Sequence, residues 1–123
     1  MAITGTHTLL YSSEPDKLRA VLRDVFAFKH IDIGHGWLIF ALPPSEIAVH
    51  PGEGPTFEAG VRHQFTLMCD NIGNTIRDLK AKGITVMNEP QQERWGIHVT
   101  LNLPGGCDVM LYEPNHAIAA GLR

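Results

Sequence analysis

The chain has 123 residues, of which 44% are hydrophobic and 19% charged, and its formal net charge at pH 7 is −3. This length is enough for one compact domain with a hydrophobic core, and the composition excludes an intrinsically disordered chain. Because the charge is small, negative and without a basic run, neither nucleic acid nor an anionic membrane is expected as a partner.

The sequence favours a cytoplasmic location. The N-terminus lacks the basic and long apolar regions of a signal peptide, and no apolar run approaches the ~20 residues that span a bilayer. The two cysteines, Cys69 and Cys107, are not arranged as a Cys-x-x-Cys motif. Reduced thiols are the simplest interpretation, although two cysteines also allow a disulfide.

The first half of the chain, about residues 1–50, predicts the element order β-α-β-β-β. Residues 4–11 alternate in polarity and predict a strand. A helix should begin near Pro15, because an apolar stripe at helical spacing follows it: Leu18, Val21, Leu22 and Val25. Three further strands are expected around 29–33, 36–42 and 45–50.

The second half, about residues 61–114, predicts the same order again. It follows a linker at 51–60 that is rich in proline and glycine. A strand at 61–68 and a helix at roughly 70–82 should precede three more strands, at 84–87, 96–103 and 107–113. The tail, 115–123, predicts at most a short helix.

A repeat links the two halves. Leu22-Arg23-Asp24-Val25 returns 54 residues later as Ile76-Arg77-Asp78-Leu79, within the two expected helices. Each half also begins with a histidine in an apolar stretch and ends with a possible metal ligand before a proline: His7 and His50 in the first half, His63 and Glu113 in the second. Such a repeat suggests one site built from two half-sites.

These four side chains suit a borderline divalent ion, namely zinc, iron(II), manganese, nickel or cobalt. Two histidines and one carboxylate would leave coordination positions open for a substrate. The alternative is that each histidine is a half-buried, hydrogen-bonded strand residue. A second feature is the strand at 96–103, which places His98, Thr100 and Asn102 on one face and so predicts a polar wall of a cleft.

The order of elements resembles the vicinal oxygen chelate superfamily, which includes glyoxalase I, extradiol dioxygenases and bleomycin-resistance proteins. The resemblance is carried mainly by the stretch HQFTLMCDNIGNTIRDLKAKGITV, at 63–86, and by EPQQERWGIHVTLNLPGGCDVMLYEP, at 89–114. It implies an α+β fold in which two tandem βαβββ modules form a cupped, mostly antiparallel sheet with helices on the outer face.

The resemblance also implies roles for individual residues. His7, His63 and Glu113 are similar to the two-histidine, one-glutamate metal set of several of these enzymes. His50 stands where glyoxalase I has a glutamate, and it could act as a ligand or a general base; His50 and Glu113 are therefore the expected catalytic pair. Trp95 is expected at the rim of the cleft and would contact the substrate together with His98, Thr100 and Asn102.

Two functions follow from this resemblance. The first is a metal-dependent enzyme, a glyoxalase-like lyase or isomerase or an extradiol-type dioxygenase, that chelates neighbouring oxygens of a small molecule. The second is a metal-free drug-binding protein similar to the bleomycin-resistance proteins. Both readings expect a small-molecule partner, and a homodimer is expected because members of this superfamily often pair.

Overall fold

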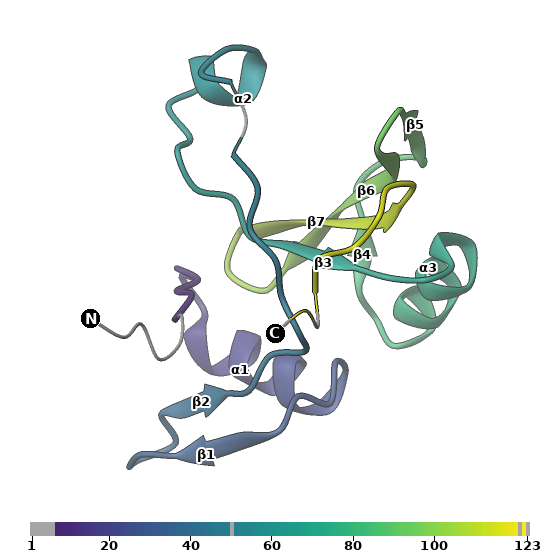
Figure 1. Ribbon diagram of the computed structural model, residues 1–123. Coiled ribbons are helices and arrows are strands. Elements are labelled where there is room, and N and C mark those ends of the chain that lie inside the picture. The colour runs from purple at the N-terminus through teal and green to yellow at the C-terminus, as the bar shows by residue number, and fades with distance from the viewer. Residues whose placement is uncertain (1–6, 50, 121, 123) are drawn as a thin grey trace.

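The computed structural model describes residues 7–49, 51–120 and 122, and its larger sheet is formed by the second half of the chain (Figure 1). The strand order is β3-β7-β6-β4, with β5 also paired to β6, and only β3 and β7 are parallel. These strands are β3 (Thr66–Met68), β4 (Thr85–Val86), β5 (Gln91–Glu93), β6 (Gly96–Leu103) and β7 (Cys107–Pro114).

Helix α3 (Ile72–Ala81) supplies the layer that covers this sheet. The Asn71 side chain caps it by accepting the Asn74 N–H at 2.9 Å, and Gly83, at φ +86°, follows its end. The buried core combines residues of α3 with alternate residues of β6 and β7: Ile72, Leu79, Val99, Leu101, Leu103, Val109 and Leu111. Because a strand turns every second side chain to the same face, this core confirms the predicted α+β class.

The first half forms a smaller unit. Helix α1 (Pro15–Asp24) begins at the predicted proline and buries Leu18. Strands β1 (His30–Asp32) and β2 (Leu38–Phe40) pair antiparallel as a separate two-stranded sheet. Its turn needs left-handed backbone at His35, where φ is 55°, and the flanking glycines also have positive φ.

Two strands expected in the first half are absent from the described residues. Residues 7–11 and 45–49, the described parts of these predicted strands, contain no strand, and the described strands form two separate sheets. The linker expected at 51–60 contains a short helix, α2 (Pro55–Glu58), and residues 115–120 contain none. A polarity pattern shows which face of a strand would be buried, but a strand forms only where another strand satisfies its backbone groups.

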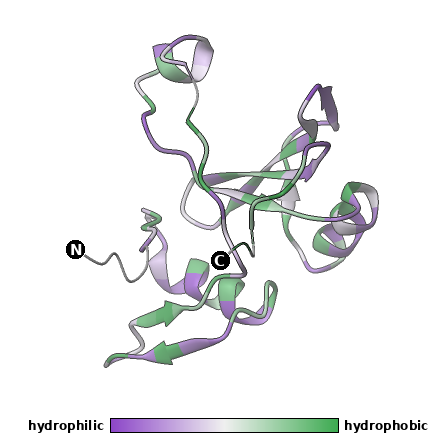
Figure 2. Ribbon diagram, in the orientation of Figure 1, coloured by the Kyte–Doolittle hydropathy of each residue, from purple (hydrophilic) through white to green (hydrophobic). Residues whose placement is uncertain are grey.

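The segment 45–49 leads from β2 toward α2, and its last three residues, 47–49, are apolar and open to solvent. Figure 2 shows these three residues as hydrophobic, and Ile47 and Val49 are 94% and 93% exposed. Apolar side chains exposed to this degree, on a segment without a strand partner among the described residues, are unusual for a compact monomer.

Hydrogen bonds at two places join the halves. The Ser12 hydroxyl donates to the Pro104 carbonyl at 2.6 Å, next to a bond from the Ser13 N–H to the Gly105 carbonyl. At the other end of the first half, the Glu46 carboxylate accepts the N–H groups of Ala119 and Ala120, at 2.6 and 3.1 Å. The tail is therefore tied to the segment that leaves β2.

None of the helices in the described part of the chain has the length and apolar character needed to cross a bilayer.

Candidate functional site

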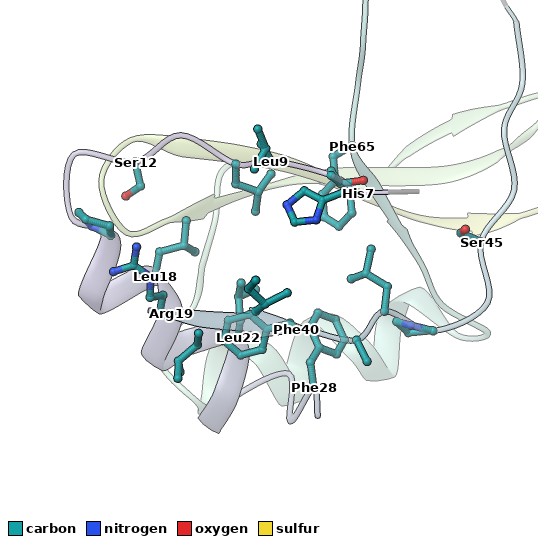
Figure 3. A pocket seen from close by; sticks show the side chains of 18 of the residues that line it. His7, Leu9, Ser12, Leu18, Arg19, Leu22, Phe28, Phe40, Ser45 and Phe65 are labelled. Atoms are coloured by element: carbon teal, nitrogen blue, oxygen red, sulfur yellow. The ribbon is translucent and has the colours of Figure 1, made fainter. Parts of the chain in front are cut away.

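A cavity of about 500 Å³ lies between α1, β2 and the segments 7–12 and 41–45 (Figure 3). Phe65, which precedes β3, reaches it from the second half of the chain. Known small-molecule sites occupy roughly 300–1,000 Å³, so the cavity is large enough for a ligand of several fused or linked rings.

The cavity lining is mainly aliphatic and aromatic. Its large apolar side chains include Leu9, Leu18, Leu22, Phe28, Phe40 and Phe65. Polar groups are few, and they include His7, Ser12, Arg19 and Ser45. Among the described residues, no aspartate or glutamate lines the cavity. An apolar wall with a few polar groups is the usual composition of a site that binds a small organic molecule.

Arg19 lies on the face of α1 that lines the cavity. Pro15, Leu18, Arg19 and Leu22 follow one another at helical spacing, and all four line it. The Arg19 guanidinium lies 4.5 Å from the centre of the Trp37 ring, at cation–π distance, and its Nη1 donates to Asp16 Oδ1 at 2.9 Å. Its side chain is only 20% exposed, whereas that of Asp16 is 95% exposed.

The polar face predicted on β6 is present, but it does not line the cavity between α1 and β2. His98, Thr100 and Asn102 are half-buried, whereas Val99 and Leu101 are fully buried, so the predicted alternation of the two faces is confirmed. None of the three polar residues lines the 500 Å³ cavity.

Aromatic rings gather at one end of this wall. The Trp95 ring stacks on His98 with 5.0 Å between ring centres, and it meets the edge of Tyr112 at 5.4 Å. Burial, and secondly the charge of Glu46, raises the pKa of the Tyr112 hydroxyl. His98 Nε2 lies 3.4 Å from Glu93 Oε1, and the buried Nδ1 has no partner among the described residues.

Other groups of the wall are used within the protein. The Asn102 side-chain amide donates to Asp108 at 2.9 Å across β6 and β7, and the Thr100 N–H donates to the Asn88 side chain. A ligand would therefore have to compete with Asp108 for the Asn102 amide. The substrate-binding role of Trp95, His98, Thr100 and Asn102 stays a prediction.

The predicted metal ligands are not brought together. His7 lines the cavity, and His63 is an exposed residue ahead of β3. Glu113 Oε1 accepts the Ile72 N–H at 3.0 Å, at the N-terminus of α3, where a carboxylate is favourable. His50 lies outside the described residues.

Among the described residues, no three histidine, cysteine, aspartate or glutamate side chains are grouped as a metal would require. The divalent metal therefore stays a prediction of the sequence. Glu113 instead has a structural contact with α3, and its expected catalytic role stays a prediction.

Of the described candidate ligands that the repeat indicates, only His7 lines the cavity. One signal for the cavity is present in the sequence, because Phe28, Trp37 and Phe40 place three aromatic side chains within thirteen residues, and all three line it. A second signal was Arg19, a charged residue within the apolar stripe of α1. The repeat indicates histidines and a carboxylate as site residues, whereas the cavity depends on how α1 and β2 lie against segment 7–12.

Comparison with known proteins supports the fold. No protein-family model and no curated protein matches the chain. Among solved structures, TnmS3, an antibiotic binding protein from Streptomyces sp. CB03234, matches 93% of this chain and all of its own length, with 19% identity and a TM-score of 0.61.

Two structures from mobile metagenomes match as well. The integron cassette protein VCH_CASS1, from V. cholerae, has 13% identity and a TM-score of 0.50, and the match covers 92% of this chain and 98% of that protein. VPC_CASS1, from V. pseudocholerae, has 12% identity and a TM-score of 0.51, and the match covers 94% of this chain and 100% of that protein. At such low identities, these matches show that the chain shares its fold with an antibiotic binding protein and with VCH_CASS1 and VPC_CASS1.

Proposed function

We propose that this protein binds a small, aromatic and largely apolar molecule in the cavity between α1 and β2, and thereby sequesters it. The observation that carries the proposal is the cavity itself, with about 500 Å³ and a wall of phenylalanine and leucine side chains. The fold shared with the antibiotic binding protein TnmS3 also supports the proposal, because a drug-binding protein is the second function that the sequence predicts.

We place the chain, as part of this proposal, among the binding proteins of the vicinal oxygen chelate superfamily. The enzyme alternative, a metal-dependent lyase, isomerase or dioxygenase, needs a metal-ligand group, and the described residues hold none. Binding needs only the cavity and its apolar wall. We therefore favour binding over catalysis, while the divalent metal stays a prediction of the sequence without support from the described side chains.

The test is a fluorescence titration with N-phenyl-1-naphthylamine, a neutral aromatic probe whose emission rises in apolar surroundings. We expect saturable binding with one site per chain. Phe40→Ala removes part of the cavity wall and should weaken binding about tenfold, because burying a phenylalanine against a ligand contributes roughly 1.5–3 kcal/mol.

Phe57→Ala is the matched control, since Phe57 lies in α2 and does not line the cavity. Its affinity should equal that of the wild type. Circular dichroism of both variants would show that they are folded. Absence of saturable binding, or equal affinities for Phe40→Ala and wild type, would contradict the proposed function.

We also infer that the working form is a homodimer. The chain exposes 9318 Å² of surface, whereas a compact monomer of 13.6 kDa would expose about 6,600 Å². The excess, roughly 2,700 Å², is of the size that one subunit loses in a large homodimer interface. Segment 45–49 supports this inference because Ile47 and Val49 are almost fully exposed and because its backbone has no strand partner among the described residues.

A further inference from the structure

The charge of the cavity differs in sign from the charge of the whole protein. The chain carries a net charge of −3. The cavity nevertheless contains Arg19 and, among the described residues that line it, no carboxylate. A guanidinium stays protonated at any physiological pH, so the lining has a permanent positive charge. A neutral apolar ligand would not need one.

The Arg19 side chain is already held in place for binding. Its guanidinium carbon lies 4.5 Å from the centre of the Trp37 ring, and the side chain is only 20% exposed. A side chain fixed by packing loses little conformational entropy when it binds a ligand. Arginine also presents several N–H donors in a planar fork, and this geometry matches a carboxylate, sulfonate or phosphate group.

Asp16 is a weak competitor for this guanidinium. It is the one carboxylate paired with Arg19 among the described residues, and it uses a single oxygen, at 2.9 Å from Nη1. Because the Asp16 side chain is 95% exposed, water screens the pair, and exposed ion pairs contribute little. The guanidinium of this cavity-lining residue therefore keeps donors that Asp16 does not use.

We propose that the ligand of this cavity is an aromatic molecule that carries an anionic oxygen group, and that Arg19 pairs with that group while the phenylalanine side chains enclose the rings. This inference rests on the proposed binding function and adds the chemical class of the ligand. Arg19 then determines specificity, because an apolar wall alone would not distinguish an acid from its neutral analogue.

The test compares two probes that share one ring system. 8-Anilinonaphthalene-1-sulfonate carries a sulfonate, and N-phenyl-1-naphthylamine is the same scaffold without it. In the variant Arg19→Gln, we expect the affinity for the sulfonate probe to fall roughly tenfold and that for the neutral probe to change less than about twofold. Added salt should weaken sulfonate binding in the wild type and have little effect in the variant.

Arg62→Gln is the matched control. The Arg62 guanidinium also lies over an aromatic ring, at 3.7 Å from the centre of Phe57, but it does not line the cavity. Its affinities for both probes should be those of the wild type. Phe40→Ala should weaken both probes, which would show that the sulfonate probe occupies the cavity and not an exposed apolar surface.

The outcomes separate the two proposals. If neither probe binds saturably to the wild type, the proposed binding function fails. If both bind but Arg19→Gln weakens them equally, or weakens neither, the binding function stands and the anionic ligand class is overturned. The melting temperature of Arg19→Gln would show whether an equal loss comes from a damaged fold.

Discussion

At the scale of single residues, burial decides the chemistry of the two thiols. Both are free in the structure, with Cys107 buried and Cys69 half-buried. Burial is the main cause that raises the pKa of each thiol, because an apolar surrounding disfavours the thiolate. The neighbouring carboxylate of Asp108 acts in the same direction on Cys107.

These shifts predict a loss of stability in alkali. The folded state holds the two thiol protons more tightly than the unfolded state, so the stabilisation is complete below the unfolded pKa of about 8.5 and is lost as the pH rises above it. The midpoint of urea unfolding should therefore fall between pH 7 and pH 10. In the double variant Cys69→Ala, Cys107→Ala, the fall should be smaller. An equal fall in both proteins would contradict this prediction.

At the scale of elements, the turn between β6 and β7 holds the two halves together. The sequence Pro104-Gly105-Gly106 predicts this turn, and the structure confirms it. Gly105 has φ +82°, and a Cβ there would collide with the Ser12 hydroxyl and lie 2.7 Å from the Ser13 nitrogen. Gly106 has φ +74°, with open space around it. Both glycines therefore have left-handed backbone, but only Gly105 lies against Ser12 and Ser13.

This difference gives a matched pair of variants. Gly106→Ala introduces only left-handed strain and should lower the free energy of unfolding by about 1–2 kcal/mol. Gly105→Ala adds the loss of the Ser12 and Ser13 bonds, and it should cost about 3 kcal/mol in total. Chemical denaturation measures both values. Equal costs would show that the close approach of Ser12 to this turn does not stabilise the protein.

The elements whose bounds the sequence predicts best are those that pack against elements close to them in the sequence. Helix α3, expected at roughly 70–82, spans Ile72–Ala81, and β6 has the predicted bounds. Both belong to one contiguous half in which α3, β6 and β7 bury each other's apolar faces. Segments 7–11 and 45–49 also carry strand-like sequence but have no strand partner among the described residues. Polarity alone could not reveal that difference.

At the scale of the whole molecule, the surface is larger than that expected for a compact monomer of this mass. Exposed large side chains occur at several separate positions of the first half, among them Leu9, Tyr11, Ile31, Ile47 and Val49. A second copy of the chain that covers segment 45–49 would bury part of this surface and could supply the missing backbone partners. The cavity lies beside this segment, because Ser45 is part of its wall.

Sedimentation velocity tests the inferred dimer. The wild type should sediment with twice the 13.6 kDa mass of one chain. The double variant Ile47→Glu, Val49→Glu should sediment as a monomer, because two charges would lose their hydration in the interface. Met87→Glu is the control, since Met87 is 53% exposed on the second half, and it should stay dimeric. A monomeric wild type, or a dimeric double variant, would contradict the inference.

The sequence by itself determined the α+β class, both main helices, the strands of the second half other than β5, and the polar face of β6. Each of these depends on local periodicity or on contacts within one contiguous segment. Tertiary structure alone decided where the cavity lies, because α1, β2, segment 7–12 and Phe65 meet only when the chain folds back on itself. It likewise decided that Glu113 contacts the start of α3 and that Arg19 lines the cavity, since a side chain's partners follow from packing and not from its position in a repeat.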